Sequence, residues 1–346
     1  MKILVIQQKM IGDVLLSTLL CENIKKWNPS VEIDFIANKH TTPVLQNNPF
    51  IDRIIIFGDD FKKDKKLLIK FLYNQNKTKY DIIIDAYGKI ESILTTWLTP
   101  AKIKIGYNKW YTKFIYSKRI DRQTLRLKND IQLSIKNRLK LLDTIVGNDF
   151  DYVHKPKIYL NDIEKRNTKL ILNKKNKNLL LMISALGSSK LKTYPVKKMS
   201  TLLDYLVEKY NAQLILNYMP SQKEEISILF DKINSKTRKA LLIKKAPVSL
   251  REFILMTSVC DATIGNEGGA INISKSLDIP TFAIFSPQID PEVWNTSSPD
   301  EIGVHIKSYN KNFNNFNLNN KEINHFYESF NFDYFIDELS IFMNRL

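Results

Sequence analysis

The stretch KILVIQQKMIGDVLLSTLLCENIKKWNPSVEIDFIA, residues 2–37, decides the fold. It opens with an apolar run at 2–6, continues with apolar residues at helical spacing over 13–27, and ends with a second apolar run at 31–37. We interpret these segments as strand, helix and strand. Apolar strands that alternate with helices of this length are typical of a parallel sheet covered on both faces. The stretch therefore predicts an α/β fold.

The alternation continues and then restarts in the second half of the chain. Strands are expected at 53–57, 80–86, 178–185, 212–217, 240–246, 261–265 and 281–285, and helices at 196–210, 221–233, 249–260 and 268–278. Ser249, followed three residues later by Glu252, is a capping-box signature for one of these helices. Two similar series predict two α/β domains, each with a parallel sheet covered on both faces.

The domain limits follow from the helical and polar residues between the two series. We expect a first domain at 1–160 and a second at 161–320, with the linker near 150–165. Residues 321–346 predict a helical tail rich in aromatic side chains. Such side chains need a buried environment, and we expect the tail to pack back on the first domain.

The 346 residues carry 52 Lys and Arg against 36 Asp and Glu, a formal charge of +16. This excess favours an anionic partner such as nucleic acid, anionic lipid or a phosphorylated substrate, although a composition bias explains it as well. No zinc-finger or RNA-recognition signature accompanies the charge, so nucleic acid is not the expected partner. The N-terminal apolar run is too short for a signal peptide, and Cys21 and Cys260 form no CxxC motif. We expect a cytoplasmic protein.

A glycine-rich turn joins a strand to a helix in GNEGGAINISKSLDIPTFAIFSP, residues 265–287. Gly268 and Gly269 lack a Cβ atom, so an anion could approach the backbone N–H groups of 268–270 closely. A phosphate or diphosphate site is one interpretation of this turn. A tight turn that requires positive φ is the other.

A second loop, SALGSSKLKTYP at 184–195, also follows a strand directly. The hydroxyl groups of Ser188 and Ser189 could bind phosphate oxygens, and Lys190 and Lys192 could neutralise them. Taken alone, the loop fits a solvated basic segment equally well.

Asp13 lies where the first helix begins, directly after Gly12. A carboxylate at this position is favoured by the helix dipole, which is a purely structural explanation. However, open parallel sheets bind their ligands in the loops that leave the carboxyl ends of the strands. Asp13 is therefore also a candidate functional residue, with Gly12 allowing a substrate to approach closely.

Taken in order over residues 1–290, these stretches resemble glycosyltransferase family 9, the lipopolysaccharide heptosyltransferases. KMIGDVLLSTLL (9–20) is similar to the family's N-terminal G-D pattern, with Thr18 where the family often has proline. Two further groups of residues resemble its donor-domain motifs, namely Ser188, Ser189, Lys192, Tyr194 and Pro195, and then 249–252, Asp261 and 265–280. Glu267, Gly268 and Asn272 depart from the family, which has Asp, Ser or Thr, and His at these positions.

The resemblance implies a GT-B fold, with two Rossmann-like domains facing a central cleft, and an inverting transfer. Asp13 would be the catalytic base that deprotonates the acceptor hydroxyl. The first domain would bind the acceptor and the second the nucleotide-sugar donor. The residues implied for the donor diphosphate are Ser188, Ser189, Lys192, Gly268, Gly269 and Ala270, and the other donor-site candidates are Glu267, Asn272, Gln222 and Glu224.

No metal and no other cofactor is expected. His40, His154, His305 and His325 have no ligand-like spacing, and the DFD at 149–151 falls in the expected linker rather than after a strand. Lysine side chains and backbone N–H groups would then carry the charge of the leaving diphosphate.

The expected partners are a nucleotide sugar, with ADP-heptose favoured, and a glycolipid or glycan acceptor. A peripheral contact with the anionic inner face of the inner membrane would bring the enzyme to that acceptor. Candidates for this contact are aromatic residues among the lysines of the first half, which ordinary core packing explains as well: Phe61, Phe71, Tyr73, Trp97, Tyr107, Trp110, Tyr111, Phe114 and Tyr116. Alternative functions are a nucleotide-sugar epimerase or hydrolase of the same fold, or a non-enzymatic protein that binds anionic lipid or nucleic acid.

Overall fold

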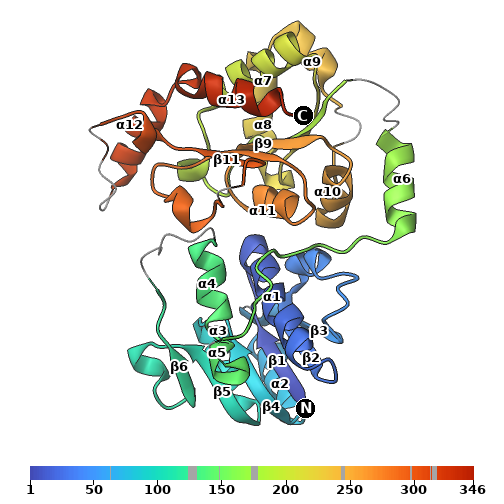
Figure 1. Ribbon diagram of the computed structural model, residues 1–346, viewed down its shortest axis with the longest axis vertical. Coiled ribbons are helices and arrows are strands. Elements are labelled where there is room, and N and C mark those ends of the chain that lie inside the picture. Colours follow the sequence, from blue (N-terminus) through green and yellow to red (C-terminus); the bar gives the residue numbers. More distant parts are fainter. Residues whose placement is uncertain are drawn as a thin grey trace. The chain divides into compact units, whose positions relative to one another are not determined.

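Two parallel sheets, each in its own unit of the chain, organise this computed structural model (Figure 1). The units are Met1–Leu160 and Asn161–Leu346. The structure describes residues 1–62, 64–123, 131–147, 149–172, 178–242, 246–296, 298–311, 313 and 318–346.

The sheet of the first unit has six strands in the order β3-β2-β1-β4-β5-β6, and all neighbours are parallel. Its strands are β1 Lys2–Ile6, β2 Glu32–Asn38, β3 Arg53–Phe57, β4 Tyr80–Asp85, β5 Ala101–Tyr107 and β6 Lys118–Ile120. The central strand β1 is fully buried from Ile3 to Ile6, as its unbroken apolar sequence requires. At its carboxyl end Ile6 is in register with Ile36 of β2 and Asp85 of β4.

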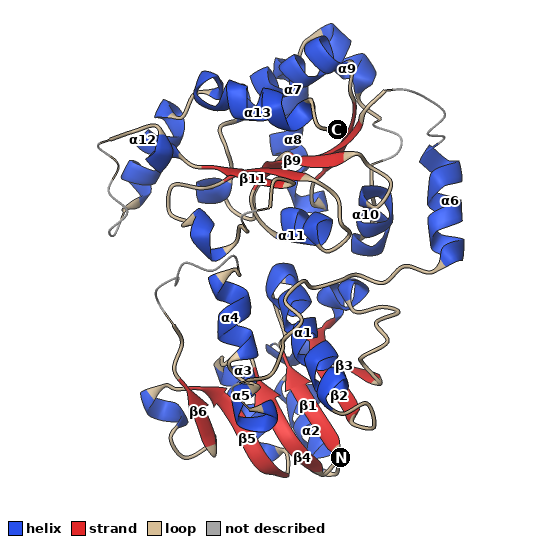
Figure 2. Ribbon diagram, viewed as in Figure 1, coloured by secondary structure: helices blue, strands red, loops and turns tan. Residues whose placement is uncertain are grey.

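Helices cover both faces of this sheet (Figure 2). Helices α1 Ile11–Trp27 and α4 Leu133–Leu139 pack together on one face, followed by the short α5 Asp143–Val146. Helices α2 Lys65–Asn76 and α3 Ile90–Leu98 lie on the other. There Leu4 and Ile6 of β1 share a core with Phe71 and Leu72 of α2.

The second unit contains a five-stranded parallel sheet in the order β11-β10-β9-β7-β8. Its strands are β7 Leu180–Ser184, β8 Gln213–Asn217, β9 Ala262–Asn266, β10 Thr281–Ile284 and β11 Glu301–Val304. Its helices are α6 Asp162–Leu172, α7 Val196–Tyr210, α8 Lys223–Lys232, α9 Ser235–Ala240, α10 Leu250–Thr257, α11 Gly269–Lys275, α12 Asn320–Ser329 and α13 Ile336–Met343. Ser249 caps α10 by accepting the N–H of Glu252, as the capping box predicts.

The C-terminal tail belongs to the second unit, so the expectation that it packs on the first domain is wrong. Phe330, Phe335 and Phe342 are fully or almost fully buried in one core with residues of β7 to β10 and α7. The Tyr194 hydroxyl, at the entry to α7, donates to the Phe330 carbonyl at 2.8 Å. A large apolar sheet face was available beside the tail in its own unit, and the tail covers it.

Both sheets reverse direction next to their first strand. The chain runs from β1 outward to β3, then returns to β4 on the other side of β1. In the second unit it runs from β7 to β8 and then returns to β9 on the other side of β7. Open α/β sheets bind ligands at such switch points, beyond the carboxyl ends of the strands. The loops after β1 and β4, and those after β7 and β9, are therefore the places to look for function.

The expected α/β class with two doubly wound parallel sheets is confirmed. The sequence interpretation missed β5, β6 and β11, which are half exposed or short. At the strand expected over 240–246, Leu241 forms a single parallel bridge with Leu214, while residues 243–245 lie outside the described part of the chain.

Candidate active site

Asp13 occupies the first turn of α1, beyond the carboxyl end of the central strand β1. Met10, the N-cap residue, has a φ of 65° and caps the helix with no side-chain hydrogen bond. Gly12 is buried beside it, and the Asp13 side chain remains 33% exposed. The carboxylate is thus held at a switch point with access to solvent, and its position still fits the favourable helix dipole.

Arg138 of α4 holds this carboxylate. Its Nη2 donates to Asp13 Oδ1 at 2.5 Å, its Nε donates to the Ser17 hydroxyl at 3.1 Å, and its Nη1 donates to the Ser134 carbonyl at 2.8 Å. The Arg138 side chain is only 9% exposed, so the guanidinium is fixed in place. Among the described residues, the other Asp13 oxygen, Oδ2, has no hydrogen-bond donor. This arrangement orients one oxygen and leaves the other for a ligand.

The loop after β4 lies on the other side of this switch point, and hydrogen bonds to Asp85 hold its backbone. The fully buried Asp85 carboxylate accepts the Tyr116 hydroxyl at 2.6 Å and the backbone N–H groups of Tyr87 and Gly88 at 3.0 and 2.8 Å. Burial raises the pKa of Asp85, while these donors oppose the rise. Burial is the main cause that raises the pKa of Tyr87. The negative charges of Glu91, Asp13 and Asp85 raise it further.

In the second unit, the loop after β7 borders a pocket of about 690 Å³. Ser188, Ser189 and Lys190 are exposed on its rim. The full lining comes from three regions, the loop and start of α7, the start of α8, and α12, and comprises Leu186, Gly187, Ser188, Ser189, Lys190, Thr193, Pro195, Val196, Lys197, Met219, Ser221, Gln222, Glu225, Ile228, Asn324, Tyr327 and Glu328. The volume suits a nucleotide-sized ligand.

Gln222 lines this pocket, but its amide is already occupied. Its Nε2 donates to the Gly187 carbonyl at 2.9 Å, and its Oε1 accepts the Met219 N–H at 2.9 Å. Gln222 therefore ties the loop after β8 to the loop after β7. Glu224 does not line the pocket, whereas its neighbour Glu225 does.

The glycine-rich turn after β9 lies at the same switch point. Gly268 has a φ of +140°, and a Cβ atom added there would meet no atom within 4 Å, so its backbone faces open space. Glu267 is 9% exposed, and no described residue donates to its Oε1. Burial raises the pKa of Glu267, and the nearby positive charge of Lys192 acts in the opposite direction. The structure thus brings Lys192 close to Glu267, and Asn272 lies with Glu267 and Gly268 along one small crevice.

Glycosyltransferase family 9, the heptosyltransferases, has a family model that matches residues 69–323. The chain belongs to glycosyltransferase family 9. Membership makes it a glycosyltransferase, rather than an epimerase or a non-enzymatic binding protein. The matched residues begin at 69, so Asp13 and Gly12 lie outside them.

Three comparisons illustrate the relationship of this family 9 glycosyltransferase to known proteins. It is 23% identical to lipopolysaccharide heptosyltransferase 1 of Campylobacter coli over 296 residues, which cover 82% of this chain and 84% of that protein. The solved family 9 glycosyltransferase of Veillonella parvula matches with a TM-score of 0.75 at 17% identity, over 89% of this chain and 87% of that one. An E. coli heptosyltransferase solved with ADP matches with a TM-score of 0.68 at 14% identity, over 95% and 99%. At these identities the structural matches establish the fold.

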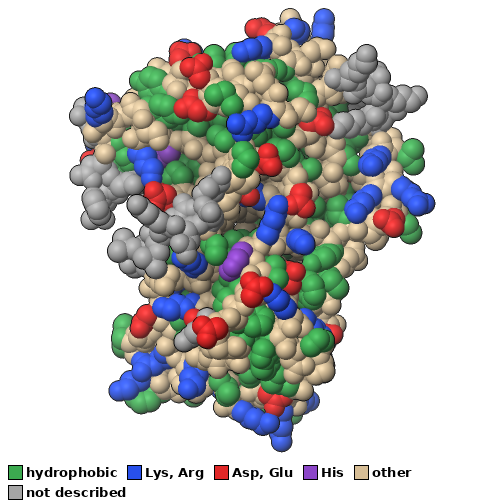
Figure 3. All heavy atoms as spheres, viewed as in Figure 1, with side chains coloured by type: hydrophobic (Ala, Val, Ile, Leu, Met, Phe, Trp, Pro, Cys, Tyr) green, Lys and Arg blue, Asp and Glu red, His purple; other side chains and the backbone are tan. Residues whose placement is uncertain are grey.

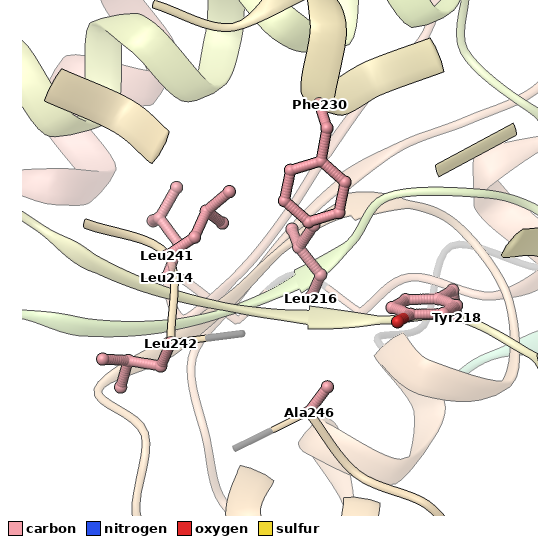
Figure 4. Close-up of a pocket in the computed structure, with 7 residues that line it drawn as sticks. All are labelled: Leu214, Leu216, Tyr218, Phe230, Leu241, Leu242 and Ala246. Atoms are coloured by element: carbon pink, nitrogen blue, oxygen red, sulfur yellow. The ribbon is translucent and has the colours of Figure 1, made fainter. Parts of the chain in front are cut away.

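Other features of the glycosyltransferase offer less for ligand binding. The apolar crevice lined by Leu214, Leu216, Tyr218, Phe230, Leu241, Leu242 and Ala246 (Figure 4) has a volume of about 10 Å³, enough for one water molecule at most. Among the described residues no group of three or more His, Cys, Asp and Glu side chains could hold a metal ion. In that same part of the chain, no helix is both long and apolar enough to cross a membrane.

The sequence interpretation of this glycosyltransferase overlooked Arg138 and Asp85. A signal for Arg138 existed, because it lies on the apolar face of a helical pattern with Ile135, Leu139 and Leu142. A charged residue on such a face usually has a buried partner. Asp85 ends a buried strand, which was also visible, but its tyrosine partner is 31 residues away along the chain and could not be identified by spacing.

Proposed function

We propose that this protein is an inverting, metal-independent glycosyltransferase that moves a heptose-like sugar from a nucleoside-diphosphate sugar to a lipopolysaccharide core or another surface glycan. The observation that carries the proposal is the nucleotide-sized pocket at the switch point of the second unit, edged by Ser188, Ser189 and Lys190. ADP-heptose is the favoured donor, because one relative is named a lipopolysaccharide heptosyltransferase and one solved structure contains ADP.

The diphosphate would lie between the loop after β7 and the turn after β9. Lys192, half buried and close to Glu267, supplies positive charge, and the hydroxyl groups of Ser188 and Ser189 donate hydrogen bonds. The backbone of Gly268, Gly269 and Ala270 can approach the phosphates, since nothing crowds Gly268. Charge on the leaving diphosphate grows in the transition state, so a lysine in this position lowers the barrier without a metal ion.

The nucleoside would occupy the remainder of the pocket. Gln222 shapes it by joining two loops, and Glu225 supplies a carboxylate that can accept from ribose hydroxyl groups. Glu224, the other sequence candidate, is exposed and outside the lining, so Glu225 replaces it in the proposal. Glu267 and Asn272 would face the sugar.

Asp13 would act as the base on the acceptor. The acceptor hydroxyl oxygen forms a bond to the anomeric carbon, the bond from that carbon to the diphosphate breaks on the opposite face, and Asp13 Oδ2 takes the hydroxyl proton. Arg138 keeps the carboxylate oriented through Oδ1 while Oδ2 stays accessible. A positioned general base contributes about 10²–10⁴-fold to such a step. An acceptor of this kind is membrane-bound, so the enzyme would work at the inner face of the inner membrane.

The test combines binding and turnover. Thermal unfolding in the presence of ADP, UDP, GDP or CDP reports which diphosphate binds, because a ligand at 100 times its Kd stabilises the folded state by about 2.7 kcal/mol. We expect ADP alone to raise the melting temperature, and ADP-heptose to yield a product one heptose heavier by mass spectrometry. Stabilisation by UDP or GDP instead would contradict the proposed donor. Turnover that stops with EDTA would contradict metal independence.

A further inference from the structure

Two aromatic side chains of the first unit are almost completely exposed. Trp110 is 88% and Phe114 92% exposed, in the segment between β5 and β6. Among the nine aromatic residues that the sequence offered as membrane contacts, Phe71, Tyr107 and Tyr116 are buried, so ordinary core packing explains these three. Exposing large rings to water is unfavourable unless a partner covers them.

Two buried residues, Thr112 and Tyr116, anchor the segment that carries these rings. Trp110 and Phe114 themselves are exposed to solvent. The Thr112 hydroxyl accepts the Lys109 N–H at 3.1 Å and donates to the Lys109 carbonyl at 2.8 Å. The Tyr116 hydroxyl is bonded to the buried Asp85. Trp110 and Phe114 are therefore displayed on an ordered base, so little conformational entropy is lost when a partner covers them.

The surroundings of the two rings are cationic. Residues 107–122 contain Lys109, Lys113, Lys118, Arg119 and Arg122 against a single acid, Asp121. The ammonium of Lys113 lies 5.9 Å from the centre of the Phe114 ring. Lysine and arginine side chains gather over this part of the first unit, where β6 is labelled in Figure 1 (Figure 3). Exposed aromatic rings among basic residues match the interface of an anionic bilayer, with rings at the acyl boundary and charges at the phosphates.

The segment also adjoins the switch point that carries Asp13. Lys109 Nζ donates to the Gly88 carbonyl at 2.5 Å, in the loop organised by Asp85. Two residues beyond Gly88, Ile90 is 79% exposed. Helix α2 offers exposed apolar residues too, Ile69 at 65% and Tyr73 at 62%, but it covers a face of the sheet rather than its carboxyl edge. The segment between β5 and β6 would therefore bring an acceptor whose lipid portion lies in a bilayer to the carboxyl edge of this sheet.

We propose that residues 109–119 form a membrane-docking surface that inserts Trp110 and Phe114 into an anionic bilayer, with the flanking lysines on the phosphate layer. Membrane binding itself is independent of catalysis, and its role in acceptor delivery rests on the proposed function. The surface needs no helix that crosses the bilayer, because a few inserted rings and a basic patch give reversible attachment.

Co-sedimentation of the full-length protein with vesicles tests the aromatic contribution. Vesicles of phosphatidylglycerol and phosphatidylethanolamine are compared with vesicles of phosphatidylcholine at low salt. We expect the Trp110→Ser/Phe114→Ser variant to bind the anionic vesicles about tenfold more weakly than wild type. The matched control, Ile69→Ser/Tyr73→Ser on α2, should bind within twofold of wild type. Equal losses in the two variants, or a loss only in the control, would overturn the proposal.

A second pair of variants tests the charges. Lys113→Glu/Lys118→Glu and Lys66→Glu/Lys70→Glu change the net charge by the same amount, in the docking segment and on α2 respectively. Only the first should abolish binding, and wild-type binding should fall as salt rises. Wild-type binding that does not depend on salt or on lipid charge would refute the membrane-docking surface and indicate a protein partner instead.

The catalytic readout separates this proposal from the proposed function. With an acceptor embedded in vesicles, Trp110→Ser/Phe114→Ser should lose activity in proportion to its lost binding. With a deacylated, water-soluble acceptor, the same variant should match wild type. If wild type transfers sugar to neither acceptor, the proposed function fails, yet the vesicle experiment still decides whether the surface exists.

Discussion

Replacing Asp13 by Asn should remove activity while leaving the fold and donor binding almost intact. The amide has the same shape, so its oxygen can still accept from Arg138 at the position where Oδ1 now lies 2.5 Å from Nη2. It cannot take a proton from an acceptor hydroxyl. The change therefore removes the base and keeps the geometry.

The expected magnitudes for the two effects are well separated. Loss of a general base lowers kcat by about 10²–10⁴, equivalent to about 3–5 kcal/mol in the barrier. Loss of the charge on Asp13, which is one-third exposed, removes the ion-pair contribution of about 1 kcal/mol from stability. In a unit of this size that lowers the melting temperature by about 2–4 °C. A melting shift of a few degrees leaves the protein folded at 25 °C and cannot produce a hundredfold loss of turnover.

The assay follows transfer of heptose by mass spectrometry of the acceptor, with ADP release measured in parallel. Thermal unfolding with and without ADP supplies the stability and donor-binding readouts. Arg138→Lys is the companion variant, because it keeps the charge but loses the hydrogen bonds to Ser17 and Ser134, and we expect about a tenfold lower kcat. Turnover of Asp13→Asn within threefold of wild type would refute the catalytic assignment and leave Asp13 as a residue that stabilises the start of α1.

Three further changes address the second unit. Lys192→Ala should weaken binding of donor and of free ADP alike, by about tenfold, and also slow the chemical step, because charge grows on the leaving group; unchanged affinity and rate in titration and single-turnover assays would remove Lys192 from the site. Burial lowers the pKa of His305 to about 4, so the contribution of His305 to folding stability is complete above its unfolded-state pKa and is lost as pH falls toward 4. The His305→Gln variant should therefore show a smaller fall in melting temperature between pH 6.5 and 4 than wild type. An unchanged slope would contradict this. Burial raises the pKa of Glu267, so folding stability decreases as pH rises from the unfolded-state to the folded-state pKa of Glu267. Glu267→Gln should have a higher melting temperature than wild type at pH 7 and the same melting temperature near pH 4. A lower melting temperature of the variant at pH 7 would show that the surroundings stabilise the charged carboxylate.

Periodicity in the sequence was sufficient for the central strands and for the two sheets. Strand β1 and helix α7 have the predicted limits, because unbroken apolar runs and a clean helical spacing leave few alternatives. The edge strands β6 and β11 were missed, since half-exposed residues carry a weak pattern. The tail was assigned to the wrong unit because aromatic content shows that a segment is buried and does not show against what.

The candidate site, too, contains residues that local motifs indicate and residues that only the tertiary structure reveals. Local motifs pointed to Ser188, Lys192 and Gly268, and the structure places them in the loops that follow the neighbouring strands β7 and β9. Arg138 was out of reach of such motifs, because it meets Asp13 across 125 residues of chain. Likewise, only the structure shows that the Gln222 amide forms hydrogen bonds with two loops and that Glu225 lines the pocket.

The burial of the tail in the second unit sets an order for biosynthesis. A ribosome completes every strand and helix of residues 1–160 early, and that unit can fold while translation continues. The second sheet cannot cover its apolar face until α13, with Leu339 and Phe342, has been synthesised. Tyr327 of α12 also forms part of the pocket wall. From the synthesis of β11 until that of α13, a nascent chain therefore carries a five-stranded sheet with an uncovered apolar face, a period in which chaperones have a target.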